Sequence, residues 1–501
     1  MILAHWLRMI LDAEERGDDW FTDRIFDVCI VGGGPAGITV ARQLAQAGWA
    51  VGLFEGGGLE YSHTSQELYE GSVTGQEYYD LTATRLRYLG GTSGHWAGWC
   101  YELEDIDFRS IDGRPHSGWP ISSADLYPYR DQTKAVLDID DPGQPPHYLD
   151  ERSSEFRAFS YRNSPPTRFG EKYREELDSS KSIEVYLHAN LVDIELAPSL
   201  GAVHRLTFRS FARPESFHIR ARYYVLCLGG LENPRALLNA NDQISTGIGN
   251  ERDNVGRFFA EHPHAQVAEA LLEEVPDDVL YFKPSEAFML EERIGNLSMH
   301  INPTGVPSLP EGGFRETVRS LVCTTSFKRR LFEAVRGRDL ECVDGTAEIS
   351  AISEQMPNPD SRVTLGGDTD RFGLRQIHLD WQLTEKDLHT LRAATLRFGA
   401  LMAEQRLGRI RPSKWLMEAN SPNDLSISEI QGGNHHMCTT RMGTDPSSSV
   451  VDASCKVHSV DNLYIGGSSV FSTAGWANPT FTIVQLAFRL ADHLNNRLKT
   501  S

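Results

Sequence analysis

The sequence has few positive charges, few cysteines and no long apolar run. Its 501 residues contain 49 Lys and Arg against 69 Asp and Glu, which gives a formal net charge of −20. Binding to nucleic acid or anionic lipid needs clustered positive charge, and a membrane helix needs roughly 18 consecutive apolar residues. The sequence shows neither feature, so we expect no nucleic-acid partner and no membrane partner.

The seven cysteines are scattered and include no Cys-x-x-Cys pair. Such a set predicts neither a disulfide framework nor a zinc site, and we expect no metal. A reducing compartment fits this cysteine usage, so the expected location is the cytoplasm. Residues 1–19 carry apolar side chains at helical spacing and no cleavage site, which predicts a helix docked on the surface rather than a signal peptide.

A strand, a glycine turn and a helix follow one another near the start of the chain. Residues 26–31 are an apolar run of the strand type, residues 32–37 read GGGPAG, and residues 38–47 have a helical pattern. In a dinucleotide-binding turn the glycines permit the tight bend, the close approach of a pyrophosphate and the packing of helix on strand. These three roles fall to Gly32, Gly34 and Gly37 respectively.

An acidic residue stands where a dinucleotide site requires one. A second strand, residues 50–54, is followed by Glu55, which lies 23 residues beyond Gly32. A carboxylate at about this spacing accepts hydrogen bonds from the adenosine ribose. Because the strand, the turn, the helix and the acid agree, the sequence predicts a site for FAD or NAD rather than a structural turn alone.

Further motifs distinguish FAD from NAD. They lie at residues 88–99 (YLGGTSGHWAGW), 434–443 (NHHMCTTRMG), 462–469 (NLYIGGSS) and 476–483 (WANPTFTI), with interior matches at 229–234 (GGLENP) and 254–257 (NVGR). Together with the glycine turn, these segments closely resemble the glucose-methanol-choline (GMC) oxidoreductases, a family of flavoproteins. The resemblance is much weaker between about residues 266 and 425.

The resemblance implies an FAD site built from both ends of the chain. Besides the three glycines and Glu55, it assigns cofactor contacts to Gly90, Gly91, Ser93, His95, Leu191, Gly229, Gly467, Ser468, Pro479 and Thr480. The GGxSxHW pattern is most similar to that of pyranose oxidases and bacterial sugar dehydrogenases, several of which carry FAD covalently on the histidine. His95 is therefore either an attachment site or a residue that packs against the isoalloxazine. Ala97 stands where some pyranose oxidases have a threonine, which leaves oxidase and dehydrogenase activity open.

The oxidation of an alcohol requires a base that accepts the hydroxyl proton while hydride leaves for the flavin N5 atom. Histidine suits this role near neutral pH. Aligning Thr439 with the threonine of the family's His-x-x-Gly-Thr pattern places the base at His435, with Cys438 in the place of the glycine. His436 would face the opposite side of an extended segment, so we interpret it as structural.

The second catalytic residue that the resemblance implies is Asn478. Its amide would hold the substrate oxygen so that the reacting carbon faces the flavin. The pair Asn478-Pro479 also has the pattern of a helix N-cap followed by proline. Both interpretations can hold together.

The interior has a different rhythm. Residues 377–383 alternate apolar and polar side chains, residues 349–355 behave similarly, and residues 366–368 (GGD) predict the turn between two strands. This pattern favours a largely antiparallel sheet. The polar side chains of His378, Asp380 and Gln382 could bind substrate hydroxyls, although a solvent-exposed face is the more frequent meaning.

Four further segments predict a strand, a helix cap, an irregular excursion and a histidine-containing loop. Residues 187–196 predict a strand whose backbone contacts adenine, and Thr384 is expected to cap a long helix. Residues 102–128 have little periodicity and predict a lid or excursion beside the active site. The segment His262-Pro263-His264 presents two imidazoles, which we interpret as loop histidines rather than as metal ligands.

The predicted fold is α/β, with a discontinuous Rossmann-like FAD-binding domain and a substrate domain whose antiparallel sheet is covered by helices. We assign residues 1–265 and 425–501 to the first domain, with the attachment loop and lid at about 88–150, and residues 266–424 to the second.

The predicted function is FAD-dependent oxidation of a hydroxyl of a sugar or glycoside to a carbonyl. A non-sugar alcohol, such as a nucleoside or a natural-product intermediate, is the alternative substrate. A non-redox flavoprotein or a lyase on the same scaffold is the alternative class. The motifs do not distinguish oxygen, a quinone or another group as the electron acceptor.

Overall fold

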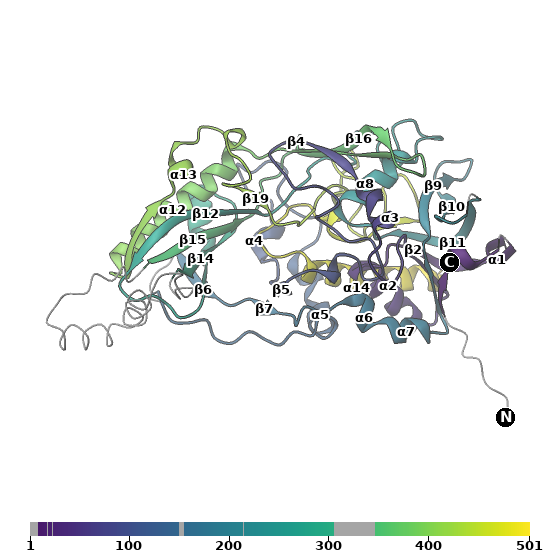
Figure 1. Ribbon diagram of the computed structural model, residues 1–501, viewed down its shortest axis with the longest axis horizontal. Helices are drawn as coiled ribbons and strands as arrows, with labels where there is room; N and C mark the ends of the chain where they lie inside the picture. The colour runs from purple at the N-terminus through teal and green to yellow at the C-terminus, as the bar shows by residue number, and fades with distance from the viewer. Residues whose placement is uncertain are drawn as a thin grey trace, which may run out of the picture.

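The computed structural model describes residues 9–17, 19–22, 24–149, 155–213, 215–304 and 346–500. Figure 1 shows one large sheet with its helices at one end of the molecule and a second large sheet at the other end. Within the described ranges, no helix is long and apolar enough to cross a membrane.

The first sheet has the arrangement of a dinucleotide-binding fold. Its parallel strands have the order β1-β8-β3-β2-β11, β20 pairs with the second half of β11, and β10 and β9 extend antiparallel from the first half. The strands are β1 (Ile10–Asp12), β2 (Ile25–Val31), β3 (Val51–Phe54), β8 (Ile183–Leu187), β9 (Asn190–Leu196), β10 (Val203–Arg209), β11 (Phe217–Leu226) and β20 (Leu463–Ile465). Helices α2 (Pro35–Gln46) and α14 (Thr480–Thr500) pack against each other beside this sheet.

Burial and sterics explain why the first βαβ unit forms here. β3 is buried along its whole length and β2 over most of it, as expected for parallel strands covered on both faces. Gly32 has φ +107°, and a Cβ there would lie 2.3 Å from the carbonyl oxygen of Cys227. A Cβ on Gly37 would lie 1.9 Å from the carbonyl oxygen of Gly32. Both positions therefore require glycine.

The second sheet is antiparallel throughout its described strands, in the order β18-β12-β15-β14-β13-β6, with β19 paired to β12. The strands are β6 (Phe156–Phe159), β12 (Pro263–Leu272), β13 (Leu280–Pro284), β14 (Leu297–Pro303), β15 (Thr346–Ser353), β18 (Gly408–Pro412) and β19 (Gln431–Gly432). Helix α12 (Glu385–Glu404) packs on β12, β15 and β18, and begins with a capping box between Thr384 and Asp387. The predicted antiparallel sheet, the covering helix and the α/β class are confirmed.

A third sheet joins β4 (Gly71–Gly75) to the hairpin of β16 (Arg362–Thr369) and β17 (Arg375–Trp381). The predicted turn at residues 366–368 is wrong, because these residues lie inside β16 at a shift in register. The chain turns four residues later, where the Asp370 carboxylate accepts hydrogen bonds from the backbone N–H groups of Phe372 and Leu374, and Gly373 has φ +86°.

Two further expectations fail at the edge of the first sheet. Residues 1–8 lie outside the described residues, but Ile10 and Leu11 belong to β1, which gains backbone pairing beside β8 instead of forming a helix. The second expectation, a strand over residues 187–196, fails only at its start, because the chain turns at His188, whose φ is +54°, and the strand begins at Asn190. β8 ends before this turn, and β9 leaves it in the antiparallel extension.

Shorter helices complete the architecture. They are α1 (Asp19–Thr22), α3 (His63–Gln66), α4 (Asp105–Phe108), α5 (Arg130–Leu137), α6 (Phe169–Lys172), α7 (Arg174–Asp178), α8 (Gly229–Asn239), α9 (Glu286–Glu292) and α13 (Lys414–Glu418). α8 follows directly from β11, so its first residues lie at the carboxyl edge of the parallel sheet, where ligands bind in folds of this kind.

Candidate active site

A cavity of about 950 Å³ is lined by residues of the first sheet's carboxyl edge and of the second sheet. Most of the site residues expected from sequence line it: Gly32, Gly34, Glu55, Gly91, Ser93, His95, Leu191, Gly229, His435, Gly467, Ser468, Asn478, Pro479 and Thr480. Gly37 and Gly90 are not among the lining residues. Gly37 packs behind the turn, and the backbone N–H of Gly90 donates to the carbonyl of Gly33.

The glycine-turn end of the cavity fits a dinucleotide. A Cβ built on Gly34 meets nothing within 4 Å, so the space in front of this residue is open to a pyrophosphate. Gly34 precedes the first turn of α2, whose N-terminal N–H groups and dipole favour a phosphate. The residues present therefore fit the diphosphate of FAD.

Glu55 is buried and is held by the backbone on both sides. Its Oε2 atom accepts a hydrogen bond from the N–H of Gly33 and its Oε1 atom accepts one from the N–H of Gly57, each at 2.8 Å. Each carboxylate oxygen has a second lone pair that can accept from a ribose hydroxyl. This geometry matches the ribose-binding role expected for Glu55.

The loop before His95 is fixed by hydrogen bonds. The Ser93 hydroxyl donates to the carbonyl of Gly90 at 2.6 Å, and Arg168 donates to the carbonyls of Ser93 and Trp96. The His95 side chain makes no hydrogen bond with any described residue and lines the cavity. Burial and the nearby Arg168 lower the pKa of His95, so its imidazole is neutral at physiological pH.

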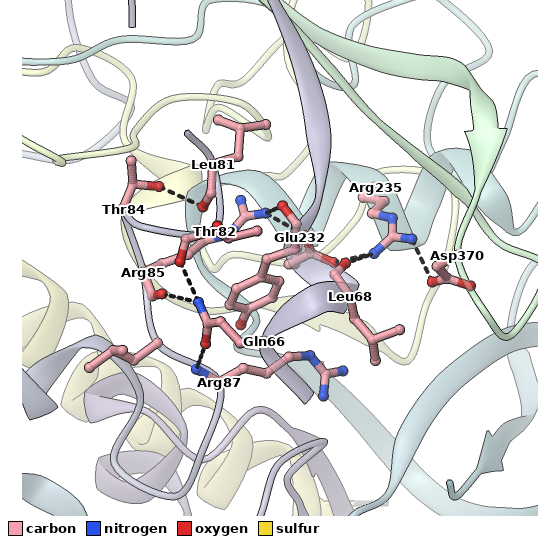
Figure 2. Close-up of polar contacts among 12 residues, drawn as sticks. Gln66, Leu68, Leu81, Thr82, Thr84, Arg85, Arg87, Glu232, Arg235 and Asp370 are labelled. Carbon is pink, nitrogen blue, oxygen red and sulfur yellow. Dashed lines mark hydrogen bonds and ion pairs between the residues drawn. The ribbon is translucent and has the colours of Figure 1, made fainter. Parts of the chain in front are cut away.

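A buried ionic cluster holds one wall of the cavity (Figure 2). Arg235 donates to the carboxylates of Asp370 at 2.7 Å and Glu232 at 3.1 Å, and to the carbonyl of Leu68 at 2.9 Å. Arg85 pairs with the second oxygen of Glu232 at 3.1 Å. Removing one partner of such a cluster leaves a buried charge uncompensated. The cluster thus ties the start of α8 to two other segments.

Gln66 orders the backbone that leads from this cluster into the loop of His95. Its side-chain amide donates to the carbonyls of Thr82 and Arg85, both at 2.6 Å, and accepts from the N–H of Arg87 at 3.1 Å. Because the chain continues directly to Gly90, this stapled segment positions the residues that face the cavity.

His435, the base expected from the sequence, lines the cavity. Its Nδ1 atom is 2.9 Å from Nδ1 of His262, and its backbone N–H donates to the Glu261 carboxylate. The Nε2 atom of His435 makes no hydrogen bond with any described residue. Burial, followed by repulsion from His262, His264 and His436, holds the pKa of His435 well below its usual range. The ring is neutral and can accept a proton.

His436 points to a different environment, as expected for alternate side chains of an extended segment. Its Nε2 atom lies 2.9 Å from the hydroxyl of Tyr78, which in turn donates to Glu261. Burial and the nearby Arg85 lower the pKa of His436 to about 3. We retain the interpretation of His436 as a structural residue.

Asn478 does not act as the N-cap that its sequence pattern suggests. α14 begins at Thr480, and the carbonyl of Pro479 accepts the hydrogen bond from the N–H of Ile483. The Oδ1 atom of Asn478 is buried at the cavity and has no hydrogen-bond partner. An unpartnered buried polar atom is costly unless a ligand satisfies it. This arrangement fits a residue that contacts a bound molecule.

The substrate side of the cavity contains residues that the sequence analysis did not single out. They are Trp99, Gln266, His300, Asn302 and Ser350. The alternation of polar and apolar residues along 263–267 and 297–302 was the available signal. His378, Asp380 and Gln382 do not line the cavity, and Ser72 and Thr74 hydrogen-bond the His378 ring in the third sheet. The hydroxyl-binding role considered for that strand is wrong.

The segment 102–128 does not form a lid. Its Phe108 and Trp119 are buried, and the indole N–H of Trp119 donates to the hydroxyl of Thr473 at 2.8 Å. None of its residues lines the cavity. Aromatic side chains made this irregular segment part of the core.

Comparison with known proteins extends the motif resemblance to most of the chain. Residues 27–151 match the family model of FAD dependent oxidoreductases, and residues 357–487 match that of GMC oxidoreductases. The 6'''-hydroxyparomomycin C oxidase of Streptomyces lividus is 26% identical over 94% of this chain and 92% of its own. The 2-methyl-1,2-propanediol dehydrogenase of Mycolicibacterium austroafricanum is 24% identical over 94% of this chain and 95% of its own. The structure of pyridoxine 4-oxidase from Mesorbium loti superposes with a TM-score of 0.56 at 16% identity, over 93% of this chain and 99% of that chain.

The dinucleotide cradle and these matches define the protein as an FAD-dependent oxidoreductase. The match at the carboxyl end contains His435 and Asn478, and it shows that residues 357–487 carry a GMC oxidoreductase domain, in agreement with the ordered motifs.

Two glycine substitutions separate cofactor binding from folding. Gly34→Ala is expected to weaken FAD binding at least about tenfold without lowering the stability of the apoprotein, because the added methyl group enters only the open space. Gly37→Ala is expected to destabilise the apoprotein by about 1–3 kcal/mol, because the methyl group meets a backbone oxygen. FAD titration and urea unfolding in a His95→Ala background measure the two effects. Equal loss of stability in both variants would contradict this division.

Proposed function

We propose that the protein oxidises a hydroxyl group of a sugar or glycoside to a carbonyl. The observation that carries this proposal is the shared cavity. The glycine turn and His95 line the same space as His435, whose Nε2 atom is open, and Asn478, whose Oδ1 atom has no partner. A relative named 6'''-hydroxyparomomycin C oxidase supports an oxidation of this kind.

His435 and Asn478 have complementary roles in this proposal. The neutral His435 accepts the hydroxyl proton at Nε2, and the Asn478 side chain holds the substrate oxygen near that atom. FAD, when bound, supplies the acceptor for the hydride. Fixing both groups before the reaction lowers the entropic cost of reaching the reactive geometry.

The charge of the cavity favours a neutral substrate over an amino sugar. The carboxylates among the described lining residues are Glu55, Glu232 and Asp370. Glu55 is held by two backbone N–H groups, and the other two are paired with arginines. No carboxylate in this described lining is left to pair with a substrate ammonium group. We therefore propose a neutral sugar or glycoside.

Trp99 supplies an apolar wall for a sugar ring. The residue is 36% exposed although it lines the cavity, and its ring lies near those of Tyr161, at 5.2 Å between centroids, Tyr281, at 6.1 Å, and His300, at 6.5 Å. The C–H face of a pyranose stacks on such a ring. Polar groups of Gln266, Asn302 and Ser350 lie on the second sheet and can bind hydroxyls.

A small non-sugar diol is the second candidate, because one relative is named 2-methyl-1,2-propanediol dehydrogenase. Anaerobic mixing with a panel of neutral glycosides, amino sugars and this diol tests the proposal through bleaching of the flavin absorbance. We expect neutral glycosides to give the fastest bleaching. Faster reduction by the diol than by every glycoside would reject the sugar assignment.

His435→Ala tests the base. We expect the variant to retain FAD and to be reduced at least ~100-fold more slowly, the lower end of general-base contributions. The pKa of His435 lies well below its ordinary value, so the imidazole is already deprotonated at neutral pH. The wild-type rate of flavin reduction should therefore not rise through titration of His435 as the pH increases above neutrality. His378→Ala, outside the cavity, is the control. Unchanged reduction in the His435→Ala variant would remove this residue from its role.

Trp99→Ala tests the apolar wall. We expect the dissociation constant for the sugar to rise about 3- to 10-fold, the value of an aromatic contact, with little change in the limiting reduction rate. Trp99→Phe keeps a ring and should remain near the wild type. Stopped-flow reduction at several sugar concentrations separates the two constants. A slower limiting rate with unchanged affinity would argue against stacking.

We also propose that His95 carries FAD covalently: a ring nitrogen would replace a hydrogen on the flavin 8α carbon, the two electrons would reduce the flavin, and the electron acceptor would reoxidise it. Its imidazole lines the cavity, makes no hydrogen bond with described residues and has a lowered pKa, so a neutral ring nitrogen is available. Acid precipitation should therefore leave the yellow colour in the pellet, and His95→Ala should release it. Complete release of FAD from the wild-type protein would show that His95 only contacts the flavin.

A further inference from the structure

His262 stands behind the proposed base. It precedes β12 and its side chain is fully buried. Its Nδ1 atom lies 2.9 Å from Nδ1 of His435, with the ring centroids 4.9 Å apart and the rings inclined at 80°. Two nitrogens at this distance share one proton, so one imidazole donates and the other accepts.

The surroundings of His262 indicate which ring donates. Burial lowers the pKa of His262 overall, while the backbone carbonyl groups of Ala474 and Gly475 act in the opposite direction and favour a proton on the ring; Nε2 makes no hydrogen bond with a described residue. Carbonyl oxygens only accept hydrogen bonds. Because Nδ1 of His262 faces Nδ1 of His435, a proton of His262 on Nε2 leaves its Nδ1 as an acceptor. His435 must then carry its own proton on Nδ1.

This tautomer has a direct chemical consequence for His435. With the proton on Nδ1, the lone pair of the ring lies on Nε2, the nitrogen that is not engaged by His262. In the opposite tautomer Nε2 would carry a hydrogen and could accept no proton. When His435 becomes an imidazolium, its Nδ1–H continues to donate to His262, which strengthens as a charge-assisted hydrogen bond.

We propose that His262 is a positioning residue that holds His435 in the tautomer with Nε2 unprotonated. The proposal rests on the proposed role of His435 as the base. It gives the His262-Pro263 segment, which sequence alone marked as unremarkable loop histidines, a role in the reaction. Partners that fix the tautomer of a working histidine commonly change rates by one or more orders of magnitude.

Other titratable groups lie near this pair, but among the described residues His262 is the one that contacts Nδ1 of His435. Burial and the nearby His264 lower the pKa of His262 to about 3, so it remains a neutral acceptor. His436 lies beside His435 and itself faces Arg85. The Glu261 carboxylate is engaged by backbone N–H groups of residues 262, 433 and 435, and burial raises its pKa to about 7. Burial and the nearby His264 lower the pKa of His300 to about 3.

A matched pair of variants tests the proposal in the FAD-loaded enzyme. His262→Leu removes the acceptor, whereas His262→Asn has a similar shape and can present an oxygen to Nδ1 of His435. We expect the limiting rate of anaerobic flavin reduction by a neutral glycoside to fall about 10- to 100-fold for leucine, with unchanged substrate affinity. Asparagine should restore the rate to within about threefold of wild type.

The same variants in a His435→Ala background separate positioning from a structural role. If His262 acts through His435, His262→Leu should have no further effect when His435 is absent, so the two losses are not additive. An equal loss in both backgrounds, or a wild-type rate for His262→Leu, would overturn the proposal. If His435→Ala itself reduced the flavin at the wild-type rate, the proposed function would fail first, which distinguishes the two failures.

A third variant keeps the test decisive if the leucine variant does not retain FAD. His262→Ala leaves a space beside Nδ1 of His435, and added imidazole can supply the missing acceptor. We expect imidazole to raise the reduction rate of His262→Ala several-fold and to leave the wild-type rate unchanged. Failure of imidazole to raise the rate in FAD-loaded His262→Ala would reject the proposal.

Discussion

The close approach of the Cys227 carbonyl to Gly32 is the contact on which the geometry of the cavity depends. It places the end of β2 beside the end of β11, so that α2 and α8 both begin at the same edge of the sheet. A second close approach continues from there, because a Cβ on Gly230 would lie 2.2 Å from the carbonyl oxygen of His436. Two positions without side chains thus connect the cofactor turn to the segment that carries His435.

Burial keeps a group of histidines neutral at the other end of the cavity. The pKa values of His262, His264 and His300 are lowered to about 3, 4 and 3, mainly by burial. A group of neutral imidazoles can exchange hydrogen bonds without fixed charge. The carboxylate of Glu261 accepts hydrogen bonds from the backbone N–H groups of Gly433 and His435. These bonds order the segment after residue 432 beside the start of β12.

The features that sequence could predict are those carried by local pattern or by a motif. The βαβ unit followed from apolar runs, obligatory glycines and Glu55, and the helix after Thr384 followed from Thr384 as its expected cap. The errors arose where tertiary contacts outweighed local pattern: residues 366–368 stay in a strand, and Trp119 draws an irregular segment into the core.

The candidate site shows the same division. His435 and Asn478 could be predicted from the sequence, because each lies within a short motif, residues 434–443 and 476–483. Trp99 and the hydrogen bond between His262 and His435 could not be predicted, because they depend on contacts between distant positions: His262 and His435 are 173 residues apart, and Trp99 and Tyr281 are 182 residues apart (281 − 99). Such pairs depend on how two sheets meet, and no local pattern encodes that packing.

The two walls of the cavity belong to parts of the fold with separate hydrophobic cores, so one wall can change in evolution while the other is kept. The nucleotide-binding sheet and the antiparallel sheet have their own clusters of buried side chains. Replacements at the few strand positions that point into the cavity from the antiparallel sheet change the shape offered to an incoming molecule while the diphosphate cradle stays intact. An architecture divided in this way permits new specificities to arise by drift on one layer, without repeated selection for a working redox centre.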